Sequence, residues 1–201
     1  MALGRFRKMK QLVEKIQDKA TLLDYLNHGK RAKYLYFWGH QKNMNGLVEK
    51  SCFSQWYSTS FIIDGETYRT AEHYMMAEKA KLFGDNKARE AIVSCRTPGE
   101  AKKIGRNVKG FNDNLWKEHR SDIVVTANEA KFSQNESLEE YLLSTGKRVL
   151  VEASPVDKIW GVGLAEDNPL IESPYKWRGL NLLGFALMNV RTRLQNSVLE
   201  K

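Results

Sequence analysis

Helical patterns dominate this chain, and the few strand-like runs between them are short and do not alternate with helices in a βαβ order. We expect strands at 34–38, in a hairpin at 61–68, and at 148–153. Helices are predicted at 70–83, 88–94, 98–103, 116–132, 137–144 and 180–194. Because a parallel α/β sheet requires helices between successive strands, the pattern favours the α+β class, as a predominantly helical single domain with a small antiparallel sheet.

Positive charge is concentrated at the start of the chain. Residues 1–33 contain nine basic and three acidic residues, a net charge of +6 within the total of +8. Apolar residues recur there at three- and four-residue steps from Met9 to Leu23, which predicts an amphipathic helix that ends near Asn27. This basic helical extension could attract a phosphate-rich partner such as nucleic acid, or it could only keep a solvated helix soluble.

Composition disfavours several classes of protein. The chain has the 42% hydrophobic content of a globular protein and no stretch that resembles a secretory signal or could span a bilayer. We therefore expect a soluble, cytoplasmic protein without a membrane partner. Cys52 and Cys95 form no CxxC motif, and the four histidines lack the spacing of zinc ligands. We predict no disulfide, no metal site and no cofactor.

Two opposite charges fall on the apolar side of the helix predicted at 70–83. At roughly 100° per residue, Glu72 and Lys79 share a face of the helix with Met76, Ala80 and Phe83. A buried charge needs a partner, a ligand or a shifted pKa, and such groups are common at functional sites. The alternative is that both side chains extend their charged ends to water from the boundary of the helix.

A second carboxylate, Asp157, follows the strand predicted at 148–153. Cleavage of a glycosidic bond commonly uses one carboxyl group to protonate the leaving group and another to stabilise the cationic centre or activate water, so Asp157 and Glu72 form a candidate pair. The local pattern after Pro155 favours an Asx-turn or helix cap for Asp157 instead. Lys79 offers another chemistry, because a lysine in a partly apolar site has a lowered pKa and can form a Schiff base with an opened sugar.

Aromatic side chains and glycines supply candidate ligand contacts. Trp116 and Trp160 could stack on a purine or pyrimidine, although tryptophans more often belong to the core. Gly161 and Gly163 permit close approach of the backbone to a sugar or phosphate. Three basic side chains could bind phosphate, with solvated surface as the alternative: Arg106, Lys109 and Arg178.

Several segments together carry a resemblance that no single motif carries. They are Phe53-Ser54-Gln55-Trp56-Tyr57; Ile63-Asp64-Gly65 followed by Ala71-Glu72-His73-Tyr74 and Lys79; Ala130-Lys131-Phe132; Asp157-Lys158-Ile159-Trp160-Gly161-Val162-Gly163; and Asn181-Leu182-Leu183-Gly184 ahead of Leu187-Met188 and Arg191. In this order they resemble the NADAR family, the YbiA-like N-glycosidases. The likeness covers residues 34–195 and excludes residues 1–33. One departure is Gln55, where the family often has Asn.

The resemblance implies a YbiA-like α+β fold with a cleft for N-ribosyl or ADP-ribosyl compounds. By position it makes Glu72 an acid/base, Lys79 a Schiff-base nucleophile and Asp157 a second polar group. Ligand contacts are implied for Trp116, Trp160 and Asn181. YbiA-like members cleave early intermediates of riboflavin biosynthesis, and other members remove ADP-ribose from guanine bases of nucleic acid.

We therefore predict a hydrolase of N-glycosyl bonds that acts on a phosphorylated N-ribosyl or ADP-ribosyl substrate. Its substrate would be a ribosylaminopyrimidine phosphate, or ADP-ribosyl-guanine in nucleic acid reached through the basic extension. The alternatives are a non-catalytic module that binds ADP-ribose or a nucleotide, and a basic nucleic-acid-binding protein without catalysis. The expected organisation is a basic helical extension at 1–33, an N-glycosidase domain at 34–195 and a tail at 196–201.

Overall fold

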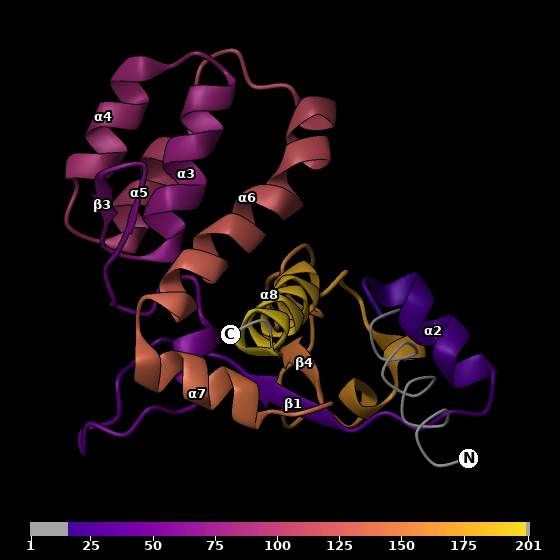
Figure 1. Cartoon of the computed structure of the whole chain (residues 1–201). Helices are drawn as coiled ribbons and strands as arrows, with labels where there is room; N and C mark the ends of the chain where they lie inside the picture. The colour runs from indigo at the N-terminus through magenta and orange to yellow at the C-terminus, as the bar shows by residue number, and fades with distance from the viewer. Residues whose placement is uncertain (1–15, 200–201) are drawn as a thin grey trace. The chain divides into compact units, whose positions relative to one another are not determined.

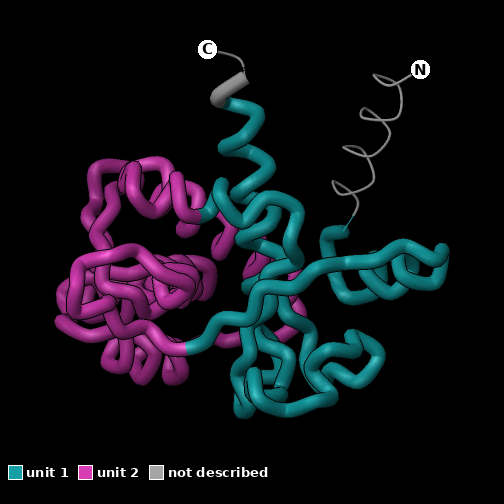
Figure 2. Tube along the Cα trace, turned by 90° about the horizontal axis from the view of Figure 1, so that it is seen from below, with its two compact units in different colours: residues 1–38, 142–201 teal, residues 39–141 magenta. Residues whose placement is uncertain are grey.

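The structure, a computed structural model, describes residues 16–199 (Figure 1). The chain divides into two compact units, which Figure 2 shows in different colours. Unit 1 combines the residues up to Trp38 with those from Leu142 onward, and unit 2 is the intervening segment Gly39–Tyr141. The chain leaves unit 1 after Trp38 and returns to it at Leu142, so unit 1 consists of two segments of the chain and unit 2 of one.

Unit 1 contains two parallel strands. β1 (Tyr34–Phe37) and β4 (Val149–Glu152) pair with Tyr34 beside Val149 and Phe37 beside Glu152. Residues 149–151 are buried, so the apolar run of β4 lies in the core. The other elements of the unit are α2 (Lys19–Asn27), η2 (Pro169–Glu172), η3 (Pro174–Lys176) and α8 (Leu182–Leu199).

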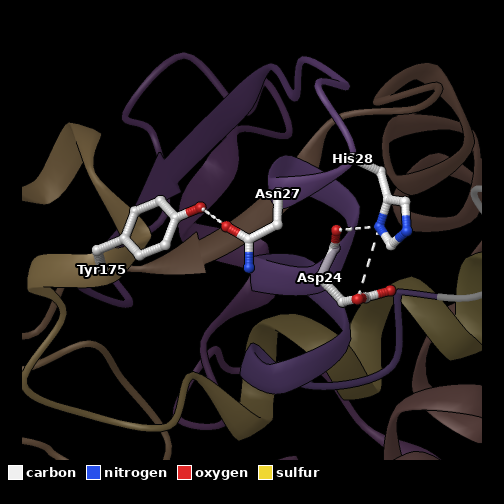
Figure 3. Close-up of polar contacts among 4 residues, drawn as sticks. All are labelled: Asp24, Asn27, His28 and Tyr175. Carbon is white, nitrogen blue, oxygen red and sulfur yellow. Dashed lines mark hydrogen bonds and ion pairs between the residues drawn. The ribbon is translucent and has the colours of Figure 1, made fainter.

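Helix α2 is tied to the loop that carries η3. The Lys19 ammonium donates a hydrogen bond to the carbonyl oxygen of Trp177 at 2.7 Å. At the other end of the helix, the Tyr175 hydroxyl donates to Asn27 Oδ1 at 2.5 Å (Figure 3). These bonds join segments about 150 residues apart in sequence and hold α2 within unit 1.

Unit 2 is mainly helical and contains one β-hairpin. Its elements are η1 (Lys50–Phe53), β2 (Phe61–Ile63), β3 (Glu66–Tyr68), α3 (Ala71–Leu82), α4 (Asn86–Ser94), α5 (Pro98–Arg106), α6 (Asp113–Ser133) and the first part of α7 (Glu136–Ser144). The hairpin turns at Asp64 and Gly65, which have φ values of 52° and 78° and match a two-residue type I′ turn. The rings of Phe61 and Tyr68 stack across the hairpin with centroids 6.0 Å apart.

Side-chain caps define where the helices of unit 2 begin. In α3, α4, α5 and α6 the residue before the helix accepts a hydrogen bond from the backbone N–H three residues further on, and these residues are Thr70, Asp85, Thr97 and Asn112. Helix α3 is the most enclosed of them, because residues 71–77 are all buried. Its polar side chains are therefore held inside unit 2 for two full turns.

The sequence-based class is confirmed: the fold is α+β, mainly helical, with an antiparallel pair in β2 and β3. The parallel pair of β1 and β4 was not predicted. The amphipathic helix predicted near the N-terminus is confirmed in its last part, as α2. This helix begins after the extended Asp18, so Ile16 is not part of it, and earlier positions such as Met9 lie outside the described residues. Between residues 16 and 199, no helix has the length and apolar character that a membrane crossing requires.

Candidate active site

The amine of Lys79 lies in partly apolar surroundings within unit 2. Its Nζ donates a hydrogen bond to the carbonyl oxygen of Gly105 at 2.8 Å and lies 4.3 Å from the ring centroid of Phe111 and 5.7 Å from that of Trp116. Within residues 16–199, no carboxylate lies within 4.0 Å of this amine. Aromatic faces attract a cation, whereas desolvation opposes it, and burial lowers the pKa of Lys79 below 10.5.

Close packing of α5 on α3 places the hydrogen-bond acceptor for Lys79. A Cβ atom added to Gly105 would lie 2.2 Å from the sulfur of Met76. Glycine permits this contact without displacing Met76, and the Gly105 carbonyl lies beside the amine one turn further along α3. Arg106, the next residue, ends α5 with an exposed side chain.

Glu72 is buried at the first turn of α3. Glu72 is only 3% exposed. The alternative interpretation, in which its charged end extends to water, is therefore wrong for this residue. The Glu72 N–H donates to the carbonyl oxygen of Gln55 at 3.0 Å, which ties the helix start to the segment after η1. At a rise of about 1.5 Å per residue, the backbones of Glu72 and Lys79 are roughly 10 Å apart along the helix axis. The two charged groups can approach one another only if their side chains lean toward each other.

Asp157 forms the Asx-turn that the local pattern favoured. Its Oδ1 accepts hydrogen bonds from the backbone N–H groups of Ile159 and Trp160, both at 2.8 Å. The Asp157 N–H in turn donates to the Ser154 hydroxyl oxygen at 3.1 Å. These bonds fix the loop of unit 1 after β4. Catalytic participation of Asp157 remains a prediction.

The glycines of the same loop allow three backbone segments to meet. A Cβ atom on Gly161 would lie 2.9 Å from the carbonyl oxygen of Glu152, and one on Gly179 would lie 2.2 Å from that of Gly161. Gly163 has a φ of +69° and lies against Arg178. The glycine pattern is therefore explained by packing within unit 1, and close approach to a ligand remains a prediction for Gly161 and Gly163.

Asn181 is fully buried and fastens β4 to the start of α8. Its Nδ2 donates to the Leu150 carbonyl at 2.9 Å, and its Oδ1 accepts from the Glu152 N–H at 2.9 Å. A Cβ atom on Gly184 would lie 2.0 Å from the same Leu150 carbonyl, so this glycine lets α8 approach the strand. Both ends of the Asn181 amide are occupied by backbone, and contact with substrate remains a prediction.

The structure thus places the predicted site residues in two groups. Glu72, Lys79, Arg106 and Trp116 belong to unit 2, where Lys79 and Trp116 are in contact. The predicted site residues of unit 1 lie in the loop after β4 and just before α8, and hydrogen bonds join these two segments. They are Asp157, Trp160, Gly161, Gly163 and Asn181.

Sequence reasoning gave no role to Lys131, which the structure buries completely. Its Nζ donates to the carbonyl oxygens of Cys52 at 2.6 Å and Ser54 at 2.9 Å, and so it holds η1 in place. Burial lowers the pKa of Lys131 to about 8. The helical periodicity that selected Glu72 and Lys79 also identifies Lys131, because Val124, Ala127 and Lys131 share the buried face of α6.

Within the described residues, no three histidine, cysteine, aspartate or glutamate side chains gather in an arrangement that could hold a metal ion. The candidate residues of unit 2 include an amine and a carboxyl group carried by one helix, Lys79 and Glu72 of α3. The class that the fold and these residues define is a small, mainly helical α+β domain with a partly buried lysine amine.

The chain belongs to the NADAR domain family, whose model matches residues 36–195. It is 44% identical to N-glycosidase R617 of Acanthamoeba polyphaga mimivirus over 168 residues, which are 81% of this chain and 97% of that protein. It is 32% identical to N-glycosidase YbiA of Escherichia coli (strain K12) over 142 residues, 71% of this chain and 80% of that protein. The NMR structure of the E. coli protein YbiA superimposes with a TM-score of 0.67 and 28% identity, covering 86% of this chain and 90% of that one.

A plant relative extends the comparison. The maize protein named "Riboflavin biosynthesis protein PYRR, chloroplastic" is 35% identical over 139 residues, which are 66% of this chain and 20% of that longer protein. At the level of the family, the chain is an enzyme of the N-glycosidase class, a hydrolase of N-glycosyl bonds.

Proposed function

We propose that this enzyme hydrolyses the N-glycosidic bond of a phosphorylated N-ribosyl substrate and that Lys79 is its nucleophile. The observation that carries the proposal is the environment of the Lys79 amine, which has aromatic neighbours, one carbonyl acceptor and a lowered pKa. A lysine that only binds phosphate gains from staying charged, whereas a nucleophilic lysine must lose its proton. Desolvation of Lys79 favours the second role.

In the proposed reaction, the neutral Lys79 amine attacks C1′ of the ribosyl group. The bond between C1′ and the nitrogen of the base breaks, and the base leaves with a proton. The new lysine–C1′ bond becomes a Schiff base when the ring oxygen leaves C1′ and takes up a proton. Water then adds to C1′, the bond to Lys79 breaks, and the ribose phosphate and the free amine are restored. One water molecule is consumed in each cycle.

Glu72 is proposed as the group that moves protons in this cycle. It lies on the same helix as Lys79 and is buried, which suits a carboxyl group that hands a proton to the departing base and takes one from the attacking water. Within unit 2, Trp116 is proposed as an aromatic contact for the base beside Lys79. For Asp157 and Trp160, in unit 1, the roles of second polar group and stacking surface stay predictions from the sequence. Arg106 is proposed to bind phosphate, because it is exposed and directly follows Gly105, whose carbonyl oxygen accepts the hydrogen bond from Lys79.

Two substrates fit this chemistry, and each has one observation in its favour. The similarity to a protein named for riboflavin biosynthesis favours a ribosylaminopyrimidine phosphate. The charge of +6 in residues 1–33 favours ADP-ribosyl-guanine in nucleic acid, because lysine and arginine bind phosphates of any sequence. The alternative function, a non-catalytic nucleotide-binding module, does not explain why the Lys79 amine is partly desolvated.

Parallel assays of both substrates test the proposal. The full chain is incubated with a ribosylaminopyrimidine phosphate and with ADP-ribosyl-guanine DNA, and the released base and sugar are quantified. Lys79→Ala should lower the rate on the true substrate by several orders of magnitude. Lys81→Ala is the matched control, since Lys81 is exposed on the same helix and pairs with Glu78 at 3.5 Å. Equal rates in Lys79→Ala and the wild type would exclude the nucleophile assignment.

A further inference from the structure

Unit 1 contains a basic pocket that is not part of the candidate active site. It has a volume of about 410 Å³. Five of its lining residues are basic: Lys30, Arg31, Lys33, Lys147 and Arg148. Among the lining residues that the structure describes, none is acidic.

The pairing of β1 with β4 explains why these charges meet. A basic segment precedes each strand, Lys30–Lys33 before β1 and Lys147–Arg148 before β4. The strands run parallel with Tyr34 beside Val149, and the Val149 N–H donates to the Lys33 carbonyl at 2.8 Å. Two segments that lie more than a hundred residues apart in sequence therefore enter the sheet at the same edge. Their like charges repel one another, and an anion between them would offset this repulsion.

The protein itself does not neutralise this charge within the described residues. No carboxylate there lies within 4.0 Å of any of the five basic groups or of Arg191. Arg191, 3% exposed, donates to the Arg148 carbonyl oxygen at 3.0 Å, and it adds a buried positive charge behind the pocket wall. Asp24 on the neighbouring helix α2 instead faces His28, 3.6 Å from the imidazole nitrogen (Figure 3).

The remaining walls are apolar and define the kind of anion. Ile16, Tyr25, Val149 and Met188 line the pocket beside the basic groups. A flat basic surface would suit a long nucleic-acid backbone, whereas a concave site with apolar walls suits a discrete ligand, and the volume lies in the range of roughly 300–1,000 Å³ found for small-molecule sites. Tyr25 is among the lining residues, and an aromatic ring is a suitable stacking partner for a flat organic group.

We propose that this pocket binds a small phosphorylated organic anion, of the class in which two linked phosphates are joined to a flat apolar group, as in a nucleoside diphosphate. The basic side chains from both segments would bind the phosphates, and the apolar wall would hold the organic part. The site lies at the amino-terminal ends of β1 and β4, whereas Asn181 and the candidate loop of unit 1 are fastened at Glu152, the carboxyl-terminal end of β4. The proposal does not depend on the catalytic role of Lys79.

Calorimetric titration of the full chain tests the site, with inorganic pyrophosphate, ADP and a single-stranded DNA 12-mer as separate probes. ADP should bind more tightly than pyrophosphate, because it adds contacts with the apolar wall. The double variant Lys33→Glu and Lys147→Glu should weaken both by at least about tenfold, since charge-assisted hydrogen bonds to phosphate are lost. The control pair Lys87→Glu and Lys176→Glu has the same net charge and should bind as the wild type does.

Two further variants separate this site from the others. Tyr25→Ala should weaken ADP and leave pyrophosphate unchanged, and the retained pyrophosphate binding reports an intact fold. Lys79→Ala should bind both probes normally, even if it is inactive, so failure of the proposed catalysis leaves this result untouched. Equal losses in the two double variants, or binding of the DNA with no saturable binding of ADP or pyrophosphate, would overturn the proposal.

Discussion

Lys79 Nζ lies 5.7 Å from the ring centroid of Trp116, and both residues belong to the same compact unit. The pair joins the helix that carries the candidate nucleophile to the helix that carries a candidate stacking surface. Trp116 is 9% exposed, so its largely buried ring forms one side of the surroundings of the Lys79 amine. The contact therefore connects two residues that sequence analysis selected for separate reasons.

The pH dependence of the reaction should report the Lys79 amine. Burial lowers its pKa from 10.5, so the neutral, attacking form becomes the majority at a lower pH than in a free lysine. The single-turnover rate should rise with pH and level off with a midpoint below 10.5. Quenched-flow measurements over this range would show it. A midpoint at or above the value of free lysine would mean that the amine is not desolvated in the working enzyme.

Removal of the Glu72 carboxylate should slow chemistry without unfolding the protein. Glu72→Gln keeps the volume of a 3% exposed side chain and removes its acid/base function. We expect kcat to fall by about a hundredfold or more. Circular dichroism should show an unchanged helical content. Glu78→Gln on the same helix is the control and should keep wild-type kcat. Unchanged kcat in Glu72→Gln would remove this residue from the proposed cycle.

Lys131 should make stability depend on pH in an identifiable window. Its pKa is about 8 in the folded protein and 10.5 in the unfolded chain, so between these values the unfolded state holds more protons. The free energy of unfolding should therefore rise with pH from about 8 to 10.5, relative to Lys131→Met, by about 3 kcal/mol at most. Denaturant titrations of both proteins at matched pH provide the comparison. Parallel pH curves for the two proteins would show that Lys131 does not titrate in this window.

The Asn181 side chain should contribute more to stability than to substrate affinity. Asn181→Ala leaves the Glu152 N–H and the Leu150 carbonyl without their partner, which should cost about 2–5 kcal/mol. The control Asn189→Ala, at an exposed position of α8, should change stability by less than about 0.5 kcal/mol. Chemical denaturation measures both. A stable Asn181→Ala protein with a raised KM would show instead that this amide serves the substrate.

Local patterns predicted most elements because turns, caps and periodicity act over a few residues. The Asp64–Gly65 turn and the helix beginning after Thr70 are examples. The parallel pairing of Tyr34 with Val149 was not predictable in this way, because no local signal specifies which distant strands will pair. The basic pocket was missed for the same reason.

Charge and glycine positions were harder to interpret than secondary structure. Periodicity placed Glu72 on a buried face, yet Lys131 was passed over although its own helix has the same pattern. Gly161 and Gly163 fitted a ligand-binding motif equally well, but their packing depends on Gly179 and Arg178, which are distant in the loop. Tertiary contacts of this kind decide whether a polar or small residue serves the fold or a ligand.

Chemical trapping at Lys79 tests the central claim most directly. The wild-type enzyme is incubated with the substrate it turns over in the parallel assays, borohydride is added during turnover, and the digested protein is analysed by peptide mass spectrometry. The expected result is a reduced ribose-phosphate adduct on Lys79, absent from Lys79→Ala and retained in Lys81→Ala. Turnover that continues in Lys79→Ala, together with no adduct on residue 79 of the wild type, would contradict it.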